Sequence, residues 1–244
     1  MDIAPIRWNL LPYALLLLSL ALPGSSIADP SLTPYSAEYQ VKISVLSGRL
    51  TTDLRTAGDG FVATHIIRPT GLARMISDGS ITETSRFGTT EGDVKATWYR
   101  SEDSLSKDKT KAQVTFDWYS NEMSGTVNDE EVQILLDGLV HDRVAIQYQL
   151  MQDLLNGVTE DSYVLFDIDK FKTLIVSNIG EREIQTPAGN FKAVGIQHRT
   201  EHSDRVTTLW CVPTLGYLPA LIEQHRDGKL RLRALLKNHS PLAD

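Results

Sequence analysis

The chain has 244 residues and a net charge of -7, with 41% hydrophobic and 23% charged residues, a composition typical of a globular protein. The acidic balance argues against a nucleic-acid partner, because affinity for phosphate backbones comes from Lys and Arg. Cys211 is the sole cysteine, so no disulfide can form within the chain, and its apolar neighbours predict that it packs as a small hydrophobe.

Residues 1–28 have the pattern of a secretory signal peptide. Arg7 precedes an apolar run from Leu10 to Leu22, and helix-breaking and small residues follow it up to Ala28. The run is shorter than the roughly 20 apolar residues that span a bilayer. We therefore expect cleavage after Ala28, a mature chain without a transmembrane span, and a periplasmic location. Residues 29–244 are expected to form a single mainly-β domain.

The first half of the mature chain has the period of β-strands. From Tyr35 to Val45 apolar and polar residues alternate, which places one set on a buried sheet face. Ser47-Gly48 and Gly58-Asp59-Gly60 then provide tight turns, so neighbouring strands are expected to be antiparallel. The same pattern predicts further strands over 49–56, 61–67, 80–87, 94–100, 112–119, 122–127 and 132–135.

One segment in the middle of the chain has helical spacing instead. Its apolar residues recur at intervals of three and four and define one face: Val140, Val144, Tyr148, Met151 and Leu155. Asp137 is expected to accept hydrogen bonds from the first turn, and Asn156-Gly157 to end the helix. A helix this apolar must pack against another element.

Strand patterns resume after the helix and predict the overall architecture. The later strands cover 163–168, 173–179, 191–200, 205–212, 217–224 and 229–237. We predict a mainly-β fold in which one long α-helix covers the concave face of a large curved antiparallel sheet, half-barrel or barrel-like. A β-sandwich is the alternative, but a sandwich covers its inner faces with strands and needs no helix.

Several segments resemble an exported bacterial family, the domain of unknown function 3108. They are Tyr39-Gln40-Val41, Phe116-Asp117-Trp118, the helix opening at Asp137 with its later Leu150 and Asp153-Leu154, the turn from Thr186 to Phe191, Trp210-Cys211-Val212-Pro213, the segment from Leu215 to Pro219, and Asp227-Gly228-Lys229. The resemblance covers nearly the whole mature chain. It implies an envelope location and an antiparallel β fold, and it supplies no activity and no catalytic residues.

The usual signatures of enzymes and metal proteins are missing from the sequence, so no cofactor and no metal are expected. His198 and His202 have a zinc-like spacing, but on a strand they stand too far apart for one ion. The pairs Asp167 with Asp169 and His225 with Asp227 suggest acid–base chemistry, although such residues are more often the polar face of a strand end.

The leading functional hypothesis is a non-enzymatic envelope protein that binds an apolar or amphiphilic molecule, such as a lipid, or acts as an accessory protein. Concave sites are mostly apolar and aromatic, which makes four residues the candidate ligand-binding set: Trp98, Trp118, Tyr148 and Trp210. The first alternative is a hydrolase of envelope glycan or peptide that uses the paired residues above. The second is a structural partner of another envelope protein through an exposed sheet edge.

Overall fold

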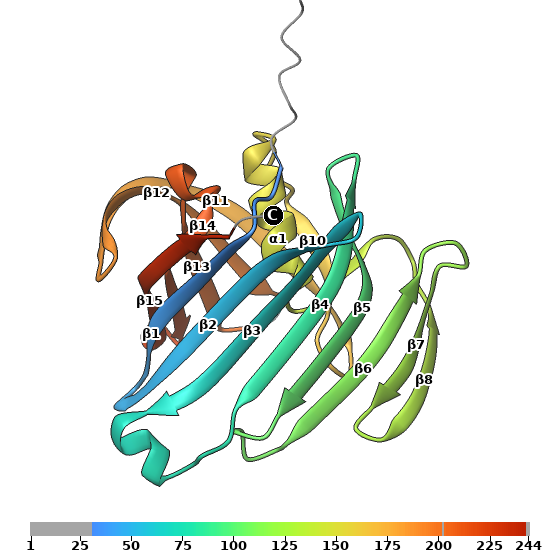
Figure 1. Ribbon diagram of the computed structural model, residues 1–244, viewed down its shortest axis with the longest axis horizontal. Coiled ribbons are helices and arrows are strands. Elements are labelled where there is room, and N and C mark those ends of the chain that lie inside the picture. The colour runs from blue at the N-terminus through green and yellow to red at the C-terminus, as the bar shows by residue number, and fades with distance from the viewer. Residues whose placement is uncertain (1–30, 202, 243–244) are drawn as a thin grey trace, which may run out of the picture.

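A computed structural model describes residues 31–201 and 203–242, and the expected signal peptide lies outside them. These residues form a 15-stranded sheet in the order β8-β7-β6-β5-β4-β3-β2-β1-β15-β14-β13-β12-β11-β10-β9. The sheet curves around a single α-helix, α1, and is not closed (Figure 1). The predicted mainly-β fold, with a curved sheet and a covering helix, is confirmed.

The strands of the N-terminal meander are β1 (Tyr35–Ile43), β2 (Leu46–Ala57), β3 (Gly60–Thr70), β4 (Ile81–Thr90), β5 (Asp93–Asp103), β6 (Thr110–Asp117), β7 (Glu122–Val127) and β8 (Glu130–Leu135). A 3-10 helix, η1 (Gly71–Met75), links β3 to β4. After β9 (Val140–His141) and α1 (Ala145–Leu155) come β10 (Ser162–Phe166), β11 (Phe171–Thr186), β12 (Gly189–Thr200), β13 (Arg205–Val212), η2 (Pro213–Leu215), β14 (Leu218–Arg226) and β15 (Lys229–Pro241).

The first hairpin turns earlier than the sequence indicated. Ile43 pairs with Leu46, so the turn consists of Ser44 and Val45, and Ser44 has a φ of 56°. Gly48 lies within β2, where an added Cβ would approach the Arg68 carbonyl to 3.1 Å. The predicted turn at Ser47-Gly48 is therefore wrong, because Gly48 serves close strand packing rather than chain reversal.

The helix also begins later than predicted. Val140 and His141 pair in parallel with Val164 and Leu165 of β10, the one parallel ladder among the described residues. α1 then starts at Ala145, and Asp142, rather than Asp137, accepts hydrogen bonds from the N–H groups of Val144 and Ala145, both at 2.8 Å. Strand pairing has displaced the first turn of the expected helix. The stop is as predicted, with Gly157 at a φ of 70°.

α1 separates two apolar clusters on the concave face. One side of the helix, with Val144, Tyr148 and Met151, packs into the larger cluster, which contains residues of β1 to β7 and also of β11 to β15. The other side, with Ile146, Leu150 and Leu154, packs against apolar residues of β10 to β13. β1 pairs with β15 as well as with β2, so the two meanders form one continuous surface around the helix. Within residues 31–201 and 203–242, no helix is long and apolar enough to cross a membrane.

Candidate functional site

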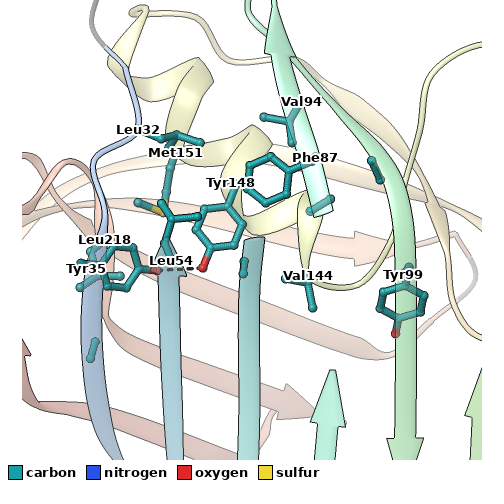
Figure 2. Packing of buried hydrophobic residues seen from close by; sticks show 14 of the residues in the cluster. Leu32, Tyr35, Leu54, Phe87, Val94, Tyr99, Val144, Tyr148, Met151 and Leu218 are labelled. Carbon is teal, nitrogen blue, oxygen red and sulfur yellow. Dashed lines mark hydrogen bonds between the residues drawn. The ribbon is translucent and has the colours of Figure 1, made fainter. Parts of the chain in front are cut away.

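Tyr148, one of the four candidate aromatic residues, is completely buried at the centre of the larger cluster. Its hydroxyl lies 3.2 Å from the Tyr35 hydroxyl and 3.4 Å from His65 Nε2. Its ring packs on Phe87, with the ring centroids 5.1 Å apart (Figure 2). In this position Tyr148 fixes α1 to the N-terminal meander.

Trp98 on β5 and Trp118, directly after β6, face different surroundings. A bulge leaves Thr97 unpaired, so Trp98 faces away from buried Ala96 and Tyr99 and lies 5.5 Å from the guanidinium carbon of Arg86. Trp118 follows β6, and its indole N–H donates to the Ala96 carbonyl at 2.6 Å.

Trp210 lies on β13 at the far side of the sheet from these two. It is buried beneath the guanidinium of Arg182, at 3.8 Å from ring centroid to carbon, and its indole N–H has no hydrogen-bond partner in the described part of the chain. The structure therefore does not bring the four aromatic residues together around one cavity. Their part in ligand binding stays a prediction.

A cleft of about 600 Å³ opens instead between the first half of α1 and strands β10 to β14. Its lining comes from Arg143 to Leu150 at the start of the helix and from the part of β12 to β14 near Thr200, Arg205 and Arg226. The apolar lining comes from the helix and from four strands: Ile146, Leu150, Leu165, Leu174, Leu209 and Ile222. The volume is within the usual range for small-molecule sites, about 300–1,000 Å³.

Charged side chains surround this apolar lining. Five are basic, Arg143, Lys172, Arg199, Arg205 and Arg226, and two are acidic, Asp167 and Asp204. Asp167 pairs with Lys172 and Arg143, and Asp204 lies 3.4 Å from Arg226. Among the described residues, neither Arg199 nor Arg205 has a carboxylate within ion-pair distance. The cleft thus has a surplus of positive charge in a protein with a net charge of -7.

A buried polar network lies next to the cleft, beneath the start of α1. Glu83 Oε1 accepts hydrogen bonds from the Tyr99 hydroxyl at 2.6 Å and the Ser101 hydroxyl at 3.3 Å, and lies 3.3 Å from Arg143 Nε. Asp142 accepts from the Ser85 hydroxyl at 2.6 Å, and burial raises the pKa of its carboxyl to about 7.

The motifs considered in the sequence did not include this network, although a signal for it exists. On β4, Glu83, Ser85 and Phe87 are two residues apart and lie on the same, buried face of the strand. The residues between them are exposed or partly exposed. A charged residue in the buried phase of a strand must be paired, because an isolated ion is costly to desolvate. The partner, Arg143, could not be identified because it is 60 residues further along the chain.

Of the paired residues considered for acid–base chemistry, Asp167, Asp169 and Asp227 lie in turns, whereas His225 lies on β14, paired with Val206 and Leu230. β10 ends at Phe166, Asp167 lines the cleft, and Asp169 is exposed in the turn that follows. Asp227 lies at the β14–β15 turn, where a hydrogen bond to exposed Asp204 raises the pKa of its carboxyl, and His225 does not line the cleft.

The histidines and other metal-ligating side chains of the described region do not form a metal site. His198 lines the cleft, and burial lowers the pKa of its imidazole to about 4, which keeps it neutral at pH 7. His202 lies outside the described residues. Over 31–201 and 203–242, no three His, Cys, Asp or Glu side chains gather closely enough to hold a metal ion. Cys211 is buried, and burial raises the pKa of its thiol to about 12.

A known family and a solved β-barrel-like structure are similar to this chain over most of its length. A family described as "Protein of unknown function (DUF3108)" matches residues 34–232, and no curated protein matches the chain. A β-barrel-like protein of domain of unknown function DUF1849 from Brucella abortus has 11% sequence identity and a TM-score of 0.59, covering 87% of this chain and 99% of its own. A protein with a YmcC-like fold from Bacteroides fragilis, also 11% identical, covers 86% and 97% with a TM-score of 0.34.

Proposed function

This chain belongs to the DUF3108 family, and we propose that it is a periplasmic protein that binds an amphiphilic molecule in the cleft beside α1. The family carries no known activity, so the proposal depends on the site itself. The leader-like residues 1–28 support an envelope location, where lipids and other amphiphiles are the abundant apolar molecules.

The observation that carries this proposal is the pairing of an apolar lining with a basic rim. Leu165, Leu174 and Leu209 offer surface to an alkyl or other apolar group, which gains free energy of about 25 cal/mol for each Å² it removes from water. Arg199 and Arg205 offer guanidinium groups, which bind carboxylate or phosphate through bidentate hydrogen bonds. An amphiphile with an acidic head group satisfies both parts.

The test is mass spectrometry of an organic extract from protein purified natively from the cell envelope, with an unrelated exported protein as the background control. We expect a stoichiometric acidic amphiphile. The variant R199S/R205S should retain at least tenfold less of it, because each lost charge-assisted hydrogen bond is worth about 1.5–3 kcal/mol.

A matched variant, R55S/R100S, removes two exposed arginines that do not line the cleft and should retain the ligand. A second test fills the cleft with L165W, which should abolish retention while the circular-dichroism spectrum of the β fold stays unchanged. A blank extract from the native protein, or equal retention by R199S/R205S and R55S/R100S, would contradict the proposal.

A further inference from the structure

Large apolar side chains are exposed at one corner of the sheet, outside the cleft. Val45 in the β1–β2 turn is 92% exposed, and Leu72, Met75 and Ile76 in and after η1 are 80%, 84% and 74% exposed. Leu72 and Met75 are three residues apart on a 3-10 helix and therefore project from the same side. Such side chains, gathered together rather than scattered, mark an interaction surface.

The β-ladder places these two segments side by side. Ser47 of β2 pairs with Thr70 of β3, so the turn before β2 and the η1 helix after β3 meet at the same end of the strands. Figure 1 shows both at its lower left, where the η1 coil hangs beside the β1–β2 turn. We call this pair of segments, residues 44–46 and 71–76, the apolar corner.

Basic side chains flank the apolar corner. A cleft of about 310 Å³ beside it is lined by Arg49, Arg68 and Arg74, with Asp78 as its acidic member. Within the described residues, Arg68 and Arg74 have no carboxylate at ion-pair distance, while Arg49 lies 3.6 Å from Glu38. This local charge is opposite in sign to the net charge of -7 of the whole chain.

We propose that the apolar corner docks the protein on the surface of an anionic lipid membrane. The exposed side chains would enter the boundary between head groups and acyl chains, which amphipathic anchors reach at about 5–10 Å depth. Arg68 and Arg74 would bind lipid phosphates, as basic residues do near anionic leaflets. The unpaired arginines beside the exposed apolar side chains are complementary to a surface that offers acyl chains and phosphates together.

The same end of the sheet carries the rim of the cleft. Ile43 pairs with Leu232 near the start of β15, and Arg226, the last residue of β14 before the turn into β15, pairs with Arg205 of β13. A docked molecule would therefore present its cleft rim and its apolar corner to the same bilayer. Docking rests on residues that the cleft does not use, so it is independent of the proposed binding function.

The test is flotation of the purified protein, as processed by the cell, with vesicles of phosphatidylglycerol and phosphatidylethanolamine or of phosphatidylcholine alone. We expect binding to the anionic vesicles that weakens as salt rises from about 50 to about 500 mM, since surface charge interactions are screened. V45S/L72S/M75S and R68Q/R74Q should each reduce partitioning about tenfold or more.

The matched control Y119S/L135S removes two exposed apolar side chains that lie away from the corner and should bind as the unmodified protein does. Equal binding by V45S/L72S/M75S and Y119S/L135S would overturn the proposal, as would absence of binding at low salt. A concentration-dependent dimer that V45S/L72S/M75S disperses would also overturn it, in favour of a second copy. If the native protein yields a bound lipid on extraction but does not bind vesicles, the docking proposal is wrong and the cleft proposal stands.

Discussion

Asp142 is a fully buried carboxyl group whose hydrogen bonds come from Ser85 and from two backbone N–H groups at the start of α1. Burial raises its pKa to about 7, whereas burial lowers the pKa of His65, His141 and His198 to about 4. These groups act in opposite directions. A raised carboxyl pKa gives stability that is lost as pH rises, and a lowered imidazole pKa gives stability that is lost as pH falls.

We predict that D142N makes the free energy of unfolding depend less on pH between about pH 5 and about pH 8. The Asp142 contribution is complete below the unfolded pKa of about 3.8 and is lost as pH rises through about 7, so unfolding free energy falls over that window. The amide that replaces the carboxyl group does not titrate. Relative to D142N, the unmodified protein should lose on the order of 2 kcal/mol between about pH 5 and about pH 8.

Urea denaturation of both proteins at these two pH values measures the difference directly. The histidines contribute equally to both proteins and cancel in the comparison. Parallel pH profiles for the two proteins would show that Asp142 does not titrate in this range.

Arg143 connects elements that are distant in the sequence. It lies directly before α1, and its side chain reaches Glu83 on β4 at 3.3 Å and Asp167 after β10 at 3.7 Å. The first contact ties the helix to the N-terminal meander, and the second ties it to the C-terminal one. This ion pair is more than a surface contact, because the Glu83 side chain is only 9% exposed.

R143Q should therefore destabilise the fold by about 2 kcal/mol, less than a fully buried pair would because the Arg143 side chain is 36% exposed. The cost comes from leaving Glu83 buried without its cation. E83Q/R143Q, which removes both charges, should recover at least half of the loss.

Chemical denaturation of the three proteins gives these values. R49Q removes the exposed arginine that pairs with Glu38 and should change stability by less than about 1 kcal/mol. If R143Q and R49Q cost the same, the Glu83–Arg143 pair does not hold the helix to the sheet.

At the scale of the whole molecule, the described residues form an open sheet, which therefore has free edges. β8 pairs with β7 on one side, and its other side has no partner strand in the described part of the chain. Its exposed residues include Glu130, Glu131 and Gln133. Charged and polar side chains on an edge strand oppose pairing with a second molecule, which is the usual protection of such edges.

Replacement of this polar surface should cause self-association. E131V/Q133V creates an apolar edge strand, and we expect dimers or larger species at micromolar concentration by multi-angle light scattering. The matched control, Q113V/T115V, places the same residue type at two exposed positions of β6, which is paired on both sides. Association of both variants to the same extent would mean that exposed apolar area matters and the free edge does not.

Local patterns predicted the elements well, since a strand with one buried face requires period two and a buried helix requires spacing of three and four. The strands over 122–127 and 205–212 appear with the predicted bounds, and the helix ends at Asn156-Gly157 as expected. The predictions that are wrong concern residues whose structure depends on a strand that is distant in the sequence. Val140 pairs with β10, and a bulge at Thr97 reverses the direction of Trp98.

Local sequence patterns were enough to establish the mainly-β class, the single helix and the curved sheet, because alternation and turn residues act over a few neighbours. The site, in contrast, emerges only when the chain is assembled. The cleft lies between α1 and strands β10 to β14, and its lining joins residues from 143 to 226. The Glu83–Arg143 pair and the apolar corner likewise join segments through strand pairing and helix packing. Burial and proximity of this kind follow from the folded arrangement, and no local sequence pattern contains them.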